Sequence, residues 1–197
     1  YMMLNLNGEG FPFSIANHCD GRRLELHIRH GDDNSAAQDI MAYLESASTV
    51  SATLPAGMRF IDSAPEQPVW FICGSTGFAP VKAMVERLIA LDFDHPVRLF
   101  WGARTPEDLY LPTLPAQWKM ALKDFDFTTA LSDIRHPDHA EGLVHEAALA
   151  ALNEPELPLF YLGGSPPMAW AVFDALVEEG VPAGNIHCDV FDYAPRE

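Results

Sequence analysis

Hydrophobic and polar positions divide this chain into two parts with different periods. In residues 1–66, short segments of alternating apolar and polar side chains are separated by glycine and proline, a pattern typical of antiparallel strands. These segments are residues 2–6, 11–16, 24–28 and 49–54. Residues 35–44 have helical spacing instead. The pattern predicts a small antiparallel β domain over residues 1–66, interrupted by one helix and ending in a polar, proline-containing linker.

From residue 67 to residue 197, continuous apolar runs alternate with amphipathic segments. Such alternation predicts a parallel sheet with right-handed crossovers and helices on both faces, an α/β domain. The predicted strands are residues 69–73, 97–101, 126–131, 158–162 and 185–191, and the predicted helices are residues 77–91, 112–123, 142–152 and 166–179.

The first strand of this domain passes directly into Gly74-Ser75-Thr76-Gly77, and an amphipathic segment follows without a gap. Glycine lets a backbone approach an anion closely, and the free N–H groups at the start of a helix carry partial positive charge. The turn therefore indicates a phosphate-binding site. The motif is short, and a tight strand-to-helix turn with nothing bound is the alternative interpretation.

Small and polar residues also follow the other predicted strands. They are Gly102-Ala103-Arg104, Ser132-Asp133 and Gly163-Gly164-Ser165-Pro166-Pro167. In parallel sheets, ligands bind beyond the carboxyl ends of the strands, so these segments predict a cleft along one edge.

Composition and charge exclude several classes of partner. The chain of 197 residues is 48% hydrophobic and 20% charged, and 12 Lys and Arg against 28 Asp and Glu give a net charge of −16. That charge repels nucleic acid and anionic membranes, so we expect neither as a partner. The three cysteines form no metal-binding or disulfide pattern and favour a reducing, cytoplasmic setting. The histidines near residue 140 have no matched ligand spacing, so we expect no metal.

The segments taken together resemble the ferredoxin–NADP reductase superfamily, and in particular its NAD(P)H-dependent flavin reductase-like members. The resemblance covers the whole chain in family order, through residues 12–17, 24–29, 74–80, 100–104, 161–168 and 188–191. It implies a partial antiparallel flavin-binding β-barrel over residues 1–66. It also implies an NAD(P)-binding α/β domain over residues 67–197, with a five-stranded parallel sheet of order 3-2-1-4-5.

The resemblance implies that a hydride passes from nicotinamide to FAD or FMN. It assigns Ser14 to a position beside the flavin N5 atom, where a hydroxyl can donate a hydrogen bond. Ser35 caps the predicted helix, either as a plain cap or as a phosphate contact. The other flavin-binding residues that it implies are Pro12, Phe13, His27, Ile28 and Arg29.

On the nicotinamide side, the resemblance makes the turn at residues 74–77 the pyrophosphate site, with Thr76 also facing the nicotinamide. Asp189 and a terminal aromatic residue would lie near the isoalloxazine ring. That residue is either Phe191 or Tyr193, and Phe191 is otherwise a core residue. The full set implied for NAD(P) is Gly74, Ser75, Thr76, Gly77, Arg104, Ser132, Asp133, Gly163, Gly164, Pro166 and Met168.

Asp133 bears on the choice of cofactor. A carboxylate repels a 2′-phosphate by about 1–4 kcal/mol and can accept a hydrogen bond from a ribose hydroxyl. The sequence therefore predicts NADH in preference to NADPH.

Three departures from the family pattern stand out. Phe11 replaces an arginine that pairs with the flavin phosphate in relatives, and Gly163 replaces a cysteine that many of them carry. Barrel strands that precede Tyr1 in the family are absent. We expect an upstream segment, or a second copy of the chain in a dimer, to supply them; the alternative is a decayed flavin domain.

The sequence predicts an NADH-dependent flavin oxidoreductase whose reduced flavin passes electrons onward. One alternative is the reductase component that delivers electrons to an oxygenase or iron–sulfur protein. The other is a nucleotide-binding module without turnover.

Overall fold

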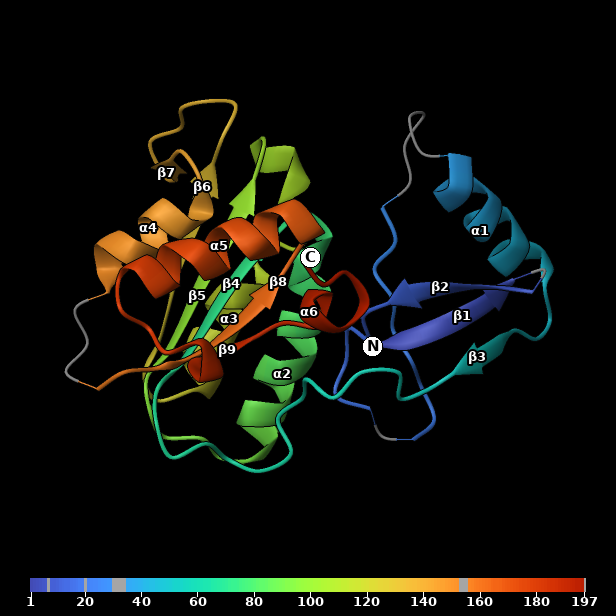
Figure 1. Ribbon diagram of the computed structural model, residues 1–197, viewed down its shortest axis with the longest axis horizontal. Coiled ribbons are helices and arrows are strands. Elements are labelled where there is room, and N and C mark those ends of the chain that lie inside the picture. Colours follow the sequence, from blue (N-terminus) through green and yellow to red (C-terminus); the bar gives the residue numbers. More distant parts are fainter. Residues whose placement is uncertain (7, 20, 30–34, 153–155, 197) are drawn as a thin grey trace.

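The computed structural model describes residues 1–6, 8–19, 21–29, 35–152 and 156–196. A three-stranded antiparallel sheet with one helix forms the first part of the chain, and a six-stranded parallel sheet flanked by helices forms the rest (Figure 1). The fold class is thus an α/β nucleotide-binding fold preceded by a small antiparallel sheet.

The small sheet has the order β2-β1-β3, with β1 at Met2–Leu6, β2 at Glu9–Phe13 and β3 at Ser51–Thr53. Alternate residues of β1, Met2, Leu4 and Leu6, are buried, because the side chains of a strand point to opposite faces in turn. They form one cluster with Ile40 of helix α1, Ser35–Ser46. This cluster is the core of the small part.

The parallel sheet has the order β7-β6-β5-β4-β8-β9. Its strands are β4 (Val69–Gly74), β5 (Val97–Ala103), β6 (Phe125–Leu131), β7 (Ala140–Glu141), β8 (Leu159–Gly163) and β9 (Ile186–His187). The central strand β4 pairs with β5 on one side and β8 on the other. It is buried on both faces, which explains its unbroken apolar run.

Alternate residues of β4 face two different helix layers. Val69, Phe71 and Cys73 belong to the core with α2, Phe78–Ala90, and α3, Leu114–Ala121. Trp70 and Ile72 belong to the core with α4, Val144–Ala151, and α5, Pro166–Glu178. Short 3₁₀ helices lie at Ser75–Gly77, Pro106–Asp108 and Ala183–Asn185.

Three expectations about strands are corrected. The sheet has six strands among the described residues, because Ala140–Glu141 adds a short edge strand beside the end of β6. The predicted strand at residues 24–28 is reduced to one bridge between Ile15 and Leu26. The predicted strand at residues 185–191 ends at His187, and helix α6, Val190–Tyr193, follows it.

The last correction has a packing cause. The apolar end of the chain covers α5 instead of extending the sheet. Phe191 contacts the rings of Trp170 and Phe173, and the indole N–H of Trp170 donates to the carbonyl oxygen of Ala194 at 3.1 Å. Helix α6 also lies beside the first residue, where the rings of Tyr1 and Tyr193 meet edge to face (Figure 1).

Within the described residues, none of the helices combines the length and apolar character that crossing a bilayer requires.

Helix α2 gives a test of the core. Leu88 is fully buried between α2 and the sheet. Leu88→Ala should lower the free energy of unfolding by about 2–5 kcal/mol, because it removes apolar contacts and leaves a cavity. Met120→Ala, at a residue that is 84% exposed, is the matched control and should change it by less than about 0.5 kcal/mol. Chemical denaturation of both variants measures the difference, and equal stabilities would contradict this packing.

Candidate active site

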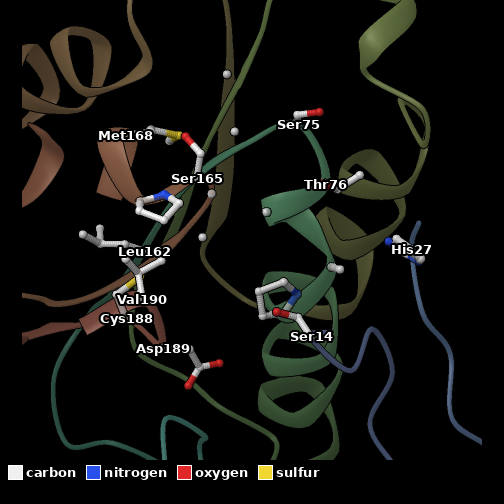
Figure 2. A pocket seen from close by; sticks show the side chains of 18 of the residues that line it. Ser14, His27, Ser75, Thr76, Leu162, Ser165, Met168, Cys188, Asp189 and Val190 are labelled. Carbon is white, nitrogen blue, oxygen red and sulfur yellow. The ribbon is translucent and has the colours of Figure 1, made fainter. Parts of the chain in front are cut away.

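A cavity of about 930 Å³ lies between the small sheet and the carboxyl edge of the parallel sheet. Figure 2 shows Ser75 and Thr76 in the turn before α2, Ser14 and His27 in the first part of the chain, and Asp189 on the C-terminal segment. The volume lies within the range of small-molecule and cofactor sites. The predicted site residues that line it are Pro12, Phe13, Ser14, His27, Ile28, Arg29, Gly74, Ser75, Thr76, Gly77, Arg104, Ser132, Gly163, Gly164, Pro166, Met168 and Asp189.

The glycines of the turn after β4 are required by close backbone approach. A Cβ atom at Gly77 would overlap the carbonyl oxygen of Gly163, and one at Gly163 would overlap the carbonyl oxygen of Gly77. A Cβ at Gly74 would lie 2.5 Å from the sulfur of Met168. The turn and the loop after β8 therefore form one continuous wall, and Gly163 has no space for a cysteine side chain.

The 3₁₀ turn at Ser75–Gly77, which precedes α2, lies at this wall. Ser75 adopts a positive φ of 48°, and its carbonyl oxygen accepts a hydrogen bond from the indole N–H of Trp101 at 3.2 Å. No side chain caps the 3₁₀ helix at residues 75–77 or the start of α2. The amide of Phe78, the first residue of α2, donates to the carbonyl oxygens of Ser75 and Thr76, so an anion here would meet the backbone of the turn before α2 and not the helix itself.

Arg29 connects the small domain to the turn. Its Nη1 donates to the hydroxyl of Ser75 at 3.4 Å, and its Nη2 lies 3.4 Å from a carboxylate oxygen of Asp108. A guanidinium next to the glycine turn suits a phosphate group. The side chain of Ser35 lies outside the described residues.

Arg104 and Asp133 form an ion pair at another part of the cavity. Arg104 Nε lies 2.8 Å from Asp133 Oδ2, and the Ser132 hydroxyl donates to Asp133 Oδ1 at 2.7 Å. The hydrogen bond from Ser132, and then the contact with Arg104, lower the pKa of the exposed Asp133. Asp133 does not itself line the cavity, whereas its two partners do.

The C-terminal segment brings Asp189 to the cavity. Burial raises the pKa of Asp189, and its Oδ1 atom has no hydrogen-bond partner within the described part of the chain. The structure places Phe191 away from the cavity, in the contact with α5 described above. Tyr193, in the same segment, lines the cavity instead.

Sequence reasoning missed Arg59 and His187, which also line the cavity. Arg59 Nη2 lies 3.4 Å from Oδ1 of Asp192. The pKa of His187 is lowered, first by burial and then by the nearby charge of Arg59. Arg59 lies in an irregular loop without a recognisable motif, so nothing in the sequence around it indicated a place at the site. Across the described residues, no group of three or more His, Cys, Asp or Glu side chains has the arrangement to hold a metal ion.

The close approach of the two glycine loops gives a second test. Gly77→Ala should destabilise the protein by about 1–3 kcal/mol, because the added methyl forces one backbone to move. Gly184→Ala is the matched control, since a Cβ there would meet nothing within 4 Å. Chemical denaturation compares the two variants, and a neutral Gly77→Ala would show that the loops lie further apart.

Comparison with known proteins agrees with this geometry. The family of oxidoreductase NAD-binding domains matches residues 71–174, just over half of the chain. The reductase component 1 of terephthalate 1,2-dioxygenase from Comamonas sp. is 30% identical over 201 residues, which cover 99% of this chain and 59% of that protein. The CDP-6-deoxy-L-threo-D-glycero-4-hexulose-3-dehydrase reductase of Yersinia pestis is 30% identical over 195 residues, which cover 97% of this chain and 58% of that protein.

The fold has solved counterparts. The cytochrome P450 reductase GcoB of Amycolatopsis superimposes with a TM-score of 0.82 at 26% identity, covering 96% of this chain and 59% of that one. The chain thus spans about three fifths of the length of the relatives that it matches. With an NAD-binding family match over its α/β part and neighbours that share both parts, the chain belongs to the oxidoreductase NAD-binding domain family within the ferredoxin–NADP reductase superfamily.

Proposed function

We propose that this chain transfers a hydride from NADH to a flavin, FAD or FMN, and that the reduced flavin passes electrons to an acceptor. One observation carries the proposal. A single cavity is lined both by Ser14 and Arg29 of the small part and by the glycine turn of the α/β part. We further propose residues 1–66 as the flavin domain and residues 67–197 as the nicotinamide domain.

The residues present fit both cofactors. The glycines at residues 74, 77 and 163 leave backbone on the cavity wall where a side chain would collide, and the turn at residues 74–77 would present its backbone to an anion. Arg29 adds a guanidinium beside them. Pro12 and Phe13 supply an apolar wall on the small-domain side. This set suits a flat ring system with a phosphate-bearing tail.

The bound flavin would supply the redox chemistry by accepting two electrons and a proton at its ring. The chain's own residues would bind the two cofactors, orient them and exclude water from the site. The Ser14 hydroxyl would donate a hydrogen bond to the ring, and Thr76 would face the nicotinamide. Asp189 is partly buried with a raised pKa, so it suits holding a proton near the ring, and Tyr193 would cover the site.

The preference for NADH is proposed from the pair at the ends of β5 and β6. The carboxylate of Asp133 offsets the positive charge of Arg104, which would otherwise favour a 2′-phosphate. A second negative charge beside a phosphate is unfavourable.

Anaerobic mixing of purified protein with NADH and added FAD or FMN tests the proposed function. We expect the flavin absorbance to bleach at a rate that saturates with NADH. The maximal rate should lie in the range of typical enzymes, ~1–10³ per second. Saturable NADH binding without bleaching would support the nucleotide-binding module instead. Ser14→Ala should slow bleaching about tenfold to a thousandfold by removing one donor to the reacting ring.

Cofactor preference is tested at Asp133. Asp133→Asn should lower the ratio of kcat/KM for NADH over NADPH by about tenfold, because one unit of negative charge is lost beside Arg104. Asp126→Asn, at an exposed carboxylate paired with Lys119 and far from the cavity lining, is the control and should leave the ratio unchanged. Preference of the unaltered chain for NADPH would overturn the proposal.

A second candidate is a reductase component that delivers electrons to an oxygenase or an iron–sulfur protein. The name of the Comamonas relative favours it, and that relative is longer than this chain. Both candidates share flavin reduction and differ only in the acceptor. Reduction of an added ferredoxin at a rate that exceeds reduction of free flavin would favour the second. Completion of the small sheet by a second copy of the chain remains a prediction.

A further inference from the structure

Lys82 is the one charged side chain that is buried among the described residues, at 9% exposure. It lies in α2, the helix that begins immediately after the glycine turn. An ammonium group removed from water is costly unless it is paired and hydrogen-bonded. The surroundings of Lys82 must therefore compensate its charge.

Three oxygen atoms do so, one for each N–H of the ammonium group. Lys82 Nζ lies 2.8 Å from a carboxylate oxygen of Glu86 in the same helix. It donates to the carbonyl oxygen of Ala16 at 3.0 Å and to a carboxylate oxygen of Glu25 at 3.1 Å. Burial lowers the pKa of Lys82, but the hydrogen bonds to Glu86 and Glu25 outweigh it and leave the pKa raised. The group thus stays charged, and two of its three partners belong to the small domain.

Other described residues of the small domain take part in the contact. The second carboxylate oxygen of Glu86 accepts the backbone N–H of His18 at 2.9 Å. The second oxygen of Glu25 lies 2.8 Å from Nε2 of His27. Inside the segment, Ala16 N–H donates to the carbonyl oxygen of Glu25 at 2.8 Å, and Asn17 accepts the N–H of Glu25 at 2.8 Å. Lys82 therefore holds both ends of one closed loop.

The two ends of that loop lead into the cavity. Ser14 precedes Ala16, and His27 and Arg29 follow Glu25, and all three line the cavity. The opposite wall, Ser75 to Gly77, is continuous with the helix that carries Lys82. One ammonium group thus joins the proposed flavin-side wall to the proposed nicotinamide-side wall through short segments of chain. Figure 1 shows α2 on the side of the parallel sheet that these loops approach.

We propose that Lys82 is a positioning residue whose ammonium group fixes the separation between the Ser14 wall and the glycine turn. The inference rests on the proposed function, because hydride transfer needs donor and acceptor atoms held about 3–3.5 Å apart. Lys82 itself does not line the cavity, so it acts through the segments that it joins.

Rapid-mixing kinetics under anaerobic conditions test the role in transfer. Lys82→Met keeps the length of the side chain and removes its charge. We expect the rate constant for flavin reduction to fall about a hundredfold, since small misplacement of reacting groups has effects of that size. The dissociation constants of NADH and of flavin, measured separately, should change by less than about threefold, because neither phosphate seat is touched. Lys119→Met, at an exposed lysine paired with Asp126, is the matched control and should leave the rate unchanged.

Hydrogen exchange tests the contact itself without turnover. Lys82→Met should accelerate exchange of the backbone amides of Ala16 and His18, while the amides of β4 and β5 stay protected. If the wild-type chain does not reduce flavin, the proposed function is wrong. The exchange measurement would still show whether Lys82 holds the loop. If Lys82→Met does not fold, Glu25→Gln can be used instead, because it removes the charge of one partner of Lys82. It should give smaller changes of the same kind, in the rate constant and in amide exchange.

Unchanged exchange at residues 16–18 would overturn the proposal. So would a normal rate constant in the variant, or a fall in rate that is fully explained by weaker binding of NADH or flavin.

Discussion

The site depends on the contact between the backbones of Gly77 and Gly163. Strands β4 and β8 pair in parallel, with Cys73 opposite Gly163, so the loops that follow them leave the sheet at the same edge. A Cβ atom at either glycine would overlap the carbonyl oxygen of the other. The two loops therefore meet without side chains between them, and this part of the cavity wall is made of backbone.

The same contact explains a departure from the family pattern. The resemblance implies a cysteine at position 163 in many relatives, and this chain has glycine there. With the loops in contact, no thiol fits between them. In the proposed reaction, hydroxyl groups and backbone amides would orient the cofactors. The distance between the two cavity walls would then determine how closely the cofactors approach each other.

Charge at the cavity is balanced pair by pair, although the chain as a whole carries a net charge of −16. Arg29 lies beside Asp108, Arg59 beside Asp192, and Arg104 beside Asp133. Each arginine supplies N–H donors, and the carboxylate beside it limits the net positive charge at that part of the cavity. This pairing supports the proposed preference for NADH, because the added 2′-phosphate of NADPH would meet an arginine whose charge is already paired.

The sequence by itself determined the order of strands and helices in the α/β part and the residues at the carboxyl ends of the strands, because burial on both faces and helical spacing are local patterns. It also indicated the glycine turn. It did not determine that residues 190–193 form a helix, which places Phe191 against α5 and Tyr193 at the cavity. Nor did it distinguish Lys82 from any other lysine on an amphipathic helix. Its burial depends on Ala16 and Glu25, which are far away in the chain, and only tertiary packing brings such groups within hydrogen-bond distance.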